Sequence, residues 1–497
     1  MNHRTRRTFL KQAAGLGAAM TVPYLVPTSA FGANDMINVA VAGIHGRGQS
    51  HIDAFCTLPG CRVTYLVDPD SRLFEARSKS VEKKSKYKPQ CVQDLRKALE
   101  DKNLDAVSIA SCNHWHSLLA IWACQAGKDV YVEKPCSHNV FEGRKLVEAA
   151  RKYNRMVQHG TQSRSDDKTA AVIGAVQSGA YGKLLVAKGY CCKPRWSIGF
   201  KEPTTPPAEL DFDLWLGPAP KQPYHENLVH YNWHWFWDTG NGDMGNQGVH
   251  EIDKARRGIG KTLPKSVVSL GCRYVNTSDY RDQGQTPNME LSVYDYDGVL
   301  LVFETRGLVT KPKKGKSQAK GQSNTGLFPD KVANEWYLEK GKIVGDKFYP
   351  HGKTEGEPLV GIDKVETDKK AKLGNHFGSF LNAVRSRKQE DLNAEILEGH
   401  LSSALCHLGN ISYRLGQPAP FTAKLDDFPA IEEVQESLQA IQDNLKDALN
   451  MDLSKYTWQV GPKLAFDAQA EKFVNNAAAD ALLTREPRPP YVVPEKV

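Results

Sequence analysis

Short apolar runs alternate with helical stretches from Met36 to about Tyr153. The strand-like runs are residues 37–42, 62–67, 106–110 and 130–132. The helical stretches between them are residues 50–58, 94–100 and 118–126. Strands that alternate with helices in this way predict a parallel, doubly wound sheet of the Rossmann type.

The pattern changes after residue 154, where the apolar runs are longer and alternate with polar positions. These runs are residues 184–190, 266–274, 289–296 and 299–304, and they predict a large, mostly antiparallel sheet. Convincing helices follow at 376–385 and 397–415, and we expect them to pack back on the first domain. The fold class is therefore α/β, with a Rossmann domain and a second α+β domain. The predicted divisions are 1–33 (signal peptide), 34–155 (Rossmann domain), 156–455 (substrate and oligomerisation domain) and 456–497 (extended tail).

The first 33 residues have the pattern of an export signal. Arg6 and Arg7 form a twin-arginine pair, a weakly apolar run follows at 13–26, and small residues at 28–30 fit a cleavage site. The alternative is a disordered basic tail. The signal predicts a protein exported to the periplasm by the twin-arginine route, which carries folded proteins. A nucleotide-dependent protein on that route should hold its cofactor tightly.

Charge and cysteine content exclude some classes of function. The 497-residue chain has a formal net charge of +8, but four basic residues of the signal segment account for half of it, so no nucleic-acid partner is predicted. The apolar run at 13–26 is too short and glycine-rich for a membrane span, and none is predicted in the mature chain. The ten cysteines include no C-x-x-C pair. His230 and His234 have helical ligand spacing but no acidic or cysteine partners, so no metal is predicted.

A glycine-rich turn follows the first strand and opens a helix, as in dinucleotide-binding folds. Its predicted cofactor-binding residues are Gly43, His45, Gly46, Arg47 and Gly48, with His45 where the usual G-x-G-x-x-G has its middle glycine. Asp68 closes the second strand, where a carboxylate accepts ribose hydroxyls and repels a 2′-phosphate. The pattern predicts NAD, with NADP kept as a lesser alternative because Arg72 lies nearby.

Polar residues follow the later strands at the sheet edge where open α/β folds bind ligands. Ser111, Asn113 and His116 follow the third strand, and Glu133 and Lys134 follow the fourth; all five are predicted to face the cofactor. A second group is predicted to bind substrate through flat rings and polar tips, the alternative for the aromatic residues being core packing or a subunit interface. This group is Arg164, Trp196, Tyr231, Trp233, His234, Asn246 and His250.

These motifs resemble the Gfo/Idh/MocA family of sugar oxidoreductases. The E-K-P triplet ending at Pro135 is fairly specific, and the family's T-P-x-x-x-H stretch is similar to residues 111–116. The resemblance implies that Lys134 is catalytic, with a bond to Pro135 that is often cis. It also implies that the family's D-x-x-x-H pair corresponds to Asn246 and His250, which we therefore include among the catalytic candidates. An amide at 246 orients a hydroxyl but does not titrate, so Asp243 or Asp253 is a candidate to compensate.

The leading prediction is an NAD(H)-dependent oxidoreductase that transfers hydride from a hydroxyl of a sugar, sugar derivative or polyol, in a homo-oligomer of two or four chains. One alternative is an NAD-dependent glycoside hydrolase or lyase that works by transient ring oxidation and elimination. The resemblance places the signature tyrosine of such N-acetylgalactosaminidases near residues 163–165, where this chain has none. A non-catalytic sugar-binding scaffold is the remaining alternative.

Overall fold

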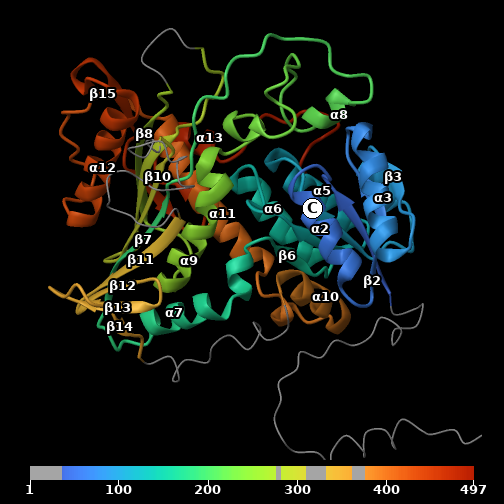
Figure 1. The fold of residues 1–497 in the computed structure, drawn as a ribbon, viewed down its shortest axis with the longest axis horizontal. Coiled ribbons are helices and arrows are strands. Elements are labelled where there is room, and N and C mark those ends of the chain that lie inside the picture. The colour runs from blue at the N-terminus through green and yellow to red at the C-terminus, as the bar shows by residue number, and fades with distance from the viewer. Residues whose placement is uncertain (1–35, 276–280, 309–331, 361–374) are drawn as a thin grey trace, which may run out of the picture.

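The computed structural model describes residues 36–275, 281–308, 332–360 and 375–497. Two sheets, each with its own helices, lie beside each other (Figure 1). The N-terminal sheet lies on the right of the view and the larger sheet on the left, with α11 (Ile396–Arg414) between them. The predicted signal segment falls outside the described residues. Within the described ranges, no helix is long and apolar enough to cross a membrane, and no group of three or more potential ligands suits a metal ion.

The N-terminal sheet is a six-stranded parallel Rossmann sheet in the order β3-β2-β1-β4-β5-β6. Its strands are β1 (Ile37–Ala42), β2 (Cys61–Val67), β3 (Gln90–Val92), β4 (Ala106–Ile109), β5 (Asp129–Val132) and β6 (Val157–His159). Its helices are α2 (Arg47–Thr57), α3 (Phe74–Ser85), α4 (Leu95–Leu99), α5 (Asn113–Gln125) and α6 (Val140–Lys152). The chain reverses direction across the sheet between β1 and β4, so the carboxyl ends of these two strands form the expected ligand crevice.

The N-terminal core continues past the predicted boundary at residue 155. Strand β6 pairs with β5 in parallel and so belongs to the Rossmann sheet. Helix α10 (His376–Ser386) also joins this core, because Phe377 and Phe380 pack in one apolar cluster with Val39 and Phe55. A helix distant in sequence thus completes the first domain, as we expected for residues 376–385.

The second sheet has twelve strands and is mostly antiparallel, β7 and β10 being a parallel pair. Its strands are β7 (Leu184–Cys191), β8 (Ser266–Cys272), β9 (Met289–Asp295), β10 (Leu300–Arg306), β11 (Val332–Leu338), β12 (Gly341–Val344), β13 (Lys347–Pro350), β14 (Glu357–Pro358), β15 (Gln417–Pro420), β16 (Thr457–Val460), β17 (Leu464–Asp467) and β18 (Lys472–Phe473). Its helices are α7 (Asp167–Gln177), α9 (Val249–Ile259), α12 (Glu432–Leu449) and α13 (Ala477–Ala481). Helix α8 (Phe212–Leu216) lies apart from this sheet, since Leu214 joins the apolar core of the Rossmann domain.

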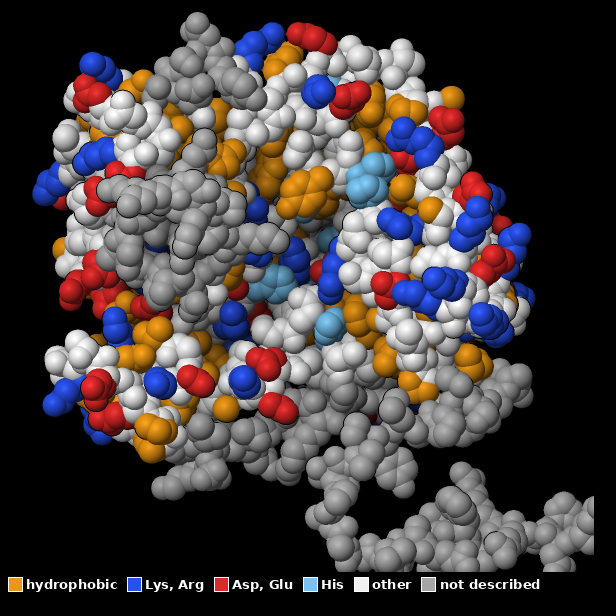
Figure 2. Space-filling view, in the orientation of Figure 1, with side chains coloured by type: hydrophobic (Ala, Val, Ile, Leu, Met, Phe, Trp, Pro, Cys, Tyr) orange, Lys and Arg blue, Asp and Glu red, His pale blue; other side chains and the backbone are white. Residues whose placement is uncertain are grey.

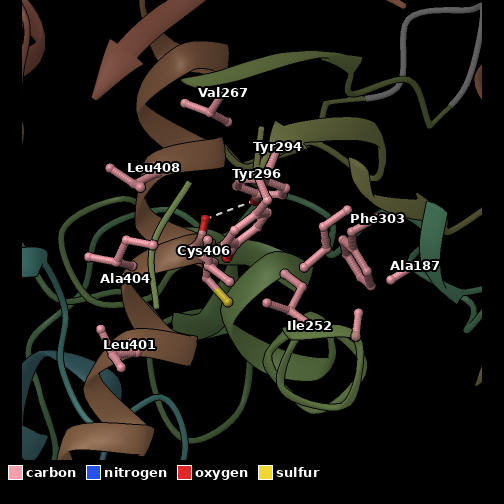
Figure 3. Close-up of a cluster of buried hydrophobic side chains, with 14 of the residues drawn as sticks. Ala187, Ile252, Val267, Tyr294, Tyr296, Phe303, Leu401, Ala404, Cys406 and Leu408 are labelled. Carbon is pink, nitrogen blue, oxygen red and sulfur yellow. Dashed lines mark hydrogen bonds between the residues drawn. The ribbon is translucent and has the colours of Figure 1, made fainter. Parts of the chain in front are cut away.

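Helices cover both faces of this sheet. On the inner face, Ile252 of α9 packs among Tyr294, Phe303 and the α11 residues Ala404 and Cys406, and Tyr294 Oη donates to the Leu405 carbonyl at 2.8 Å (Figure 3). On the outer face, α12 packs on β8, β9 and β10. Because the inner packing holds α9 on one side, the opposite side of that helix is left to face the first domain.

Residues 456–497 are more structured than the extended tail predicted from the sequence. Strands β16 and β17 pair with β8 and so extend the large sheet. The chain then crosses to the Rossmann domain, where Tyr491 and Val497 enter its apolar core (Figure 1). The regular backbone pairing of this segment was missed because its strands are only two to four residues long.

Candidate active site

A cavity of about 570 Å³ lies between the two domains at the carboxyl ends of β1, β4 and β5. It runs from the glycine turn at 43–48 to the start of α9. The space-filling view shows a hollow between the two halves, with Lys or Arg and His side chains on its walls (Figure 2). One continuous space thus joins the predicted cofactor residues to the predicted chemical groups.

The glycine turn has the shape that a pyrophosphate requires. Gly43 has φ +80°, and a Cβ there would lie 2.5 Å from the Ser111 amide nitrogen; a Cβ at Gly48 would lie 1.8 Å from the Gly43 carbonyl oxygen. Gly46 differs, since a Cβ there would meet nothing within 4 Å and would project into open space. Helix α2 begins here without a side-chain cap or an acidic residue in its first turn. Its free N–H groups therefore suit an anionic group, and these residues fit a dinucleotide.

Asp68 lies at the end of β2 and faces the same cavity. Its carboxylate accepts the Ile44 N–H at 2.9 Å and the Asp70 N–H at 3.0 Å, which fixes its orientation. Burial raises the pKa of Asp68 to about 6, against the pull of these two hydrogen bonds. The remaining lone pairs are the acceptors available to a ribose.

A residue of the second domain packs against the glycine turn. His45 stacks on His230 with ring centroids 4.4 Å apart and planes 8° apart. His230 Nε2 lies 2.7 Å from an oxygen of Asp70, which also binds the Arg72 guanidinium at 2.6 and 2.8 Å. His45 was predicted to bind the cofactor, whereas the contact of His230 with Asp70 was not predicted, because no local sequence pattern links positions 160 residues apart.

Glu133 anchors the first-domain side of the cavity. It accepts from Arg47 Nε at 2.8 Å and from His51 Nε2 at 3.1 Å. Burial alone would raise the pKa of Glu133, but these partners outweigh it and hold the pKa well below the usual range. The Lys134–Pro135 bond is cis, as the family resemblance implied. The ionised Glu133 and the neighbouring Lys134 both line the cavity.

Asn246 and His250 lie at the start of α9, within and just after a π-helical turn at Met244–Gly248. Both side chains line the cavity, as their spacing predicted. Lys134 Nζ donates to the Asn246 carbonyl oxygen, which joins the two domains. Burial lowers the pKa of Lys134, and burial together with the charge of Lys134 lowers the pKa of His250 to about 3. His250 is therefore neutral near pH 7.

The side-chain amide of Asn246 contacts a buried carboxylate, that of Asp243. Asn246 Nδ2 donates to Asp243 Oδ1 at 3.3 Å, and Arg195 Nη2 donates to the same oxygen at 2.7 Å. Of the two aspartates that the sequence offered as compensation, Asp243 is therefore the one at the site. Asp253 points elsewhere and binds Arg164.

Two residues predicted to bind substrate lie outside the cavity. Arg164 is buried and forms ion pairs with Asp253 at 2.7 Å and Glu398 at 3.0 Å, so it joins α9 to α11 rather than facing a ligand. Trp196 packs on the apolar cluster beneath α12. The structure therefore does not bring these two residues together with the other predicted site residues, since polar and aromatic groups near a domain junction serve packing as readily as binding.

The other predicted wall residues do line the cavity. Tyr231 is 55% exposed, and the rings of Trp233 and His234 stack with centroids 3.6 Å apart. On the first domain, Asn113 Nδ2 donates to Asn241 Oδ1 at 3.1 Å. The ring of His116 lies 2.6 Å from the Pro135 carbonyl oxygen and 3.0 Å from that of Ser111. Gln162, Lys193 and Gln247, which were not predicted, also line the cavity.

Comparison with known proteins reveals relatives among curated sequences and solved structures. The glycosyl hydrolase family 109 protein of Shewanella baltica (strain OS185) is 26% identical over 225 residues, which cover 40% of this chain and 48% of that protein. The chain thus spans about half the length of the curated relatives it matches.

Two solved structures share the fold at low sequence identity. The WlbA dehydrogenase from Bordetella pertussis, in complex with NADH and UDP-GlcNAcA, has a TM-score of 0.55 and 15% identity, over 76% of this chain and 97% of that chain. The myo-inositol dehydrogenase from Lactobacillus casei, in complex with NAD(H) and myo-inositol, has a TM-score of 0.50 and 14% identity, over 76% and 95%.

Family models match both domains in order along the chain. Residues 37–161 match the NAD-binding Rossmann fold of the GFO_IDH_MocA oxidoreductase family, and residues 172–273 match the family's C-terminal alpha/beta domain. With the glycine turn and Asp68 in place, the protein belongs to the Gfo/Idh/MocA family of NAD-binding oxidoreductases.

Proposed function

We propose that the protein is an NAD(H)-dependent oxidoreductase acting on a hydroxyl of a sugar, sugar derivative or polyol. The observation that carries the proposal is one cavity with a dinucleotide turn at one end and Lys134, Asn246 and His250 at the other. The dehydrogenases with the same fold, crystallised with UDP-GlcNAcA and with myo-inositol, support this substrate class.

The chain's own groups divide the work of binding and proton transfer. NAD, when bound, supplies the hydride acceptor or donor. His250 is neutral and makes no side-chain hydrogen bond within the described residues, so its ring is available to take the hydroxyl proton. Lys134 donates a hydrogen bond to the reacting oxygen and holds it against His250. Asn246 orients the hydroxyl, and Asp243 provides the negative charge that position 246 lacks.

Preference for NAD over NADP belongs to the same proposal. The Asp68 carboxylate faces the ribose end of the cavity and would repel a 2′-phosphate. Arg72 is the cation that kept NADP as an alternative. Its guanidinium donates two hydrogen bonds to Asp70 and so already has a carboxylate partner in place of a 2′-phosphate. We infer tight retention from the His45–His230 stack that closes over the turn.

A glycosidase that uses NAD transiently is the second candidate, because the curated relatives are glycosyl hydrolase family 109 proteins. Against it stands the segment 163–165, which contains no tyrosine and whose Arg164 is held in buried ion pairs. The two candidates differ in their products, because a glycosidase releases an aglycone and a simple dehydrogenase does not.

One experiment tests the proposal and separates the candidates. Purified protein is denatured and the released nucleotide is identified by mass; native protein is then screened with sugars, polyols and nitrophenyl glycosides. We expect NAD or NADH, and an absorbance change of the bound cofactor with at least one free sugar or polyol. Aglycone release without any such change would favour the glycosidase. NADP as the released nucleotide would contradict the cofactor assignment.

A further inference from the structure

The substrate end of the cavity holds more positive than negative charge. Three carboxylates lie near it, and each already has a cationic partner within the protein. Glu133 is paired with Arg47 at 2.8 Å, Asp243 with Arg195 at 2.7 Å, and Glu251 with Lys254 at 3.5 Å. Within the described residues these three carboxylates form their ion pairs with Arg47, Arg195 and Lys254, and none forms one with a lysine of the cavity wall.

Two lysines on the wall have only neutral acceptors. Lys134 donates to the Asn246 carbonyl oxygen, and Lys193 donates to the side-chain oxygen of Gln247. Neither lysine forms an ion pair within the described residues, yet both line the cavity. Burial lowers the pKa of Lys134, the carboxylates of Glu133 and Asp243 act against that shift, and the charge of Lys193 adds to it.

The proposed hydride-transfer reaction gives Lys134 a role but gives none to Lys193. Lys193 follows β7 in the second domain and donates to Gln247 beside α9, whereas the glycine turn that suits the pyrophosphate belongs to the first domain. The pyrophosphate is therefore not its natural partner. A cation that lines a partly dehydrated cavity without an ion-pair partner is costly unless an anion accompanies it. A substrate that brings negative charge removes this cost.

The hydrogen bonds of the Gln247 side chain indicate how an anion would bind to Lys193. Its Nε2 donates to Glu251 at 3.2 Å, which turns the amide oxygen toward Lys193. The ammonium group is thus held at the wall by a neutral acceptor that a carboxylate or phosphate oxygen outcompetes, since charge-assisted hydrogen bonds are about twice as strong as neutral ones. The neighbouring wall residues His234 and Tyr231 supply ring faces for the sugar.

We propose that the substrate is an anionic carbohydrate whose carboxylate or phosphate binds Lys193 while its reacting hydroxyl lies between Lys134 and His250. This rests on the proposed function and deepens it by naming the substrate class. Lys193 is then a specificity-determining residue, because neutral sugars reach the same chemical groups without the ion pair.

The test measures binding rather than turnover. Cofactor-loaded protein is titrated by calorimetry with glucose, galactose and mannose, each compared with its uronate and its 6-phosphate. We expect at least one uronate or 6-phosphate to bind about tenfold or more tightly than its neutral parent, the range for gaining a hydrogen bond to a charged group. The two anionic arms distinguish a carboxylate from a phosphate ligand.

Two variants assign the preference to a residue. Lys193→Gln should bring the anionic and neutral members of a pair to within about twofold, and rising salt should shrink the preference of the unmodified protein. Lys424→Gln, at an exposed lysine paired with Asp426, is the matched control and should leave the preference intact.

Equal binding within every pair, no binding of any anionic sugar, or a preference that survives Lys193→Gln would each overturn the inference. Neutral sugars that change the cofactor absorbance would then leave the proposed function standing. Anion binding through Lys193 without an absorbance change for any compound would instead contradict the proposed function.

Discussion

The two ends of the cavity are built in different ways. The cofactor end comes from adjacent strands of one parallel sheet, and it presents backbone N–H groups and close glycine contacts. The substrate end comes from β5, the loop after β7 and the π-helical start of α9, and it presents side chains. The difference shows that dinucleotide binding depends on local backbone geometry, whereas chemistry and specificity depend on tertiary contacts between the domains.

The largest expected effect lies at the substrate end. Lys134→Met and His250→Ala should each slow reduction of bound NAD by about 10²–10⁴-fold, the usual contribution of a general acid–base group. Because the glycine turn is untouched, both variants should still be purified with the nucleotide. Rapid-mixing absorbance with an active sugar measures the rate, and Lys424→Met is a matched surface control. Unmodified rates in both variants would remove these residues from the chemistry.

The second prediction concerns the folding stability of the protein and not ligand binding at either end of the cavity. Arg164→Met breaks the buried pair with Asp253 and should lower the free energy of unfolding by about 3–5 kcal/mol, because it leaves a carboxylate buried without its partner. Denaturant unfolding monitored by circular dichroism measures this loss. The Kd for an active sugar should stay the same at a temperature where the variant is folded. A large rise in that Kd with normal stability would restore Arg164 to the binding site.

The cofactor end should respond to pH through Asp68. Burial raises the pKa of Asp68 to about 6 in the nucleotide-free protein. The ionised carboxylate accepts hydrogen bonds from both ribose hydroxyls, whereas the protonated carboxyl must first release its proton. Below pH 6, NAD binding must expel that proton, so the affinity should fall by about tenfold per pH unit. Above pH 6 the affinity should be level.

Calorimetry of nucleotide-free protein between pH 5 and 8 checks this slope, and Asp68→Asn provides the comparison. The variant should bind NAD about 1–3 kcal/mol more weakly at pH 7.5, with no slope between pH 5 and 6 from this residue. An unchanged slope in Asp68→Asn would assign the titration to another group.

The smallest expected effect concerns the His45–His230 stack, which joins the glycine turn to the second domain. His230→Ala removes the stack on His45 and the hydrogen bond to Asp70, and it should weaken NAD retention by about 0.5–1.5 kcal/mol. His230→Phe keeps a ring for stacking and should recover part of that loss. Exchange of bound NAD for a labelled nucleotide measures both variants. Equal exchange rates in all three proteins would mean that the stack has no part in retention.

The same contrast explains what the sequence could predict. The strands β1, β2, β4 and β5 are apolar runs bounded by turns, and the glycine spacing with Asp68 identifies the cofactor end without knowledge of the second domain. The choice of Asn246 and His250 followed from the family pattern. Residues 246 and 250 were therefore placed correctly at the cavity.

What could not be predicted depends on contacts across the chain. Lys193 lies in an irregular segment with no motif, and His230 reaches Asp70 only after folding. Arg164 was misplaced because its carboxylate partners, Asp253 and Glu398, are 89 and 234 residues away. Export by the twin-arginine route and assembly into a homo-oligomer stay predictions from the sequence.

The central claim is that a carbinol carbon and the nicotinamide meet in this cavity between Lys134 and His250. Its most direct test is a single turnover with a sugar deuterated at the reacting carbon, followed by denaturation and mass analysis of the nucleotide. We expect deuterium to appear in the released NADH, and we expect Lys134→Met and His250→Ala to delay its appearance by about 10²–10⁴-fold. Oxidised sugar with no deuterium in the nucleotide, or unchanged NAD after every sugar and polyol tried, would contradict it.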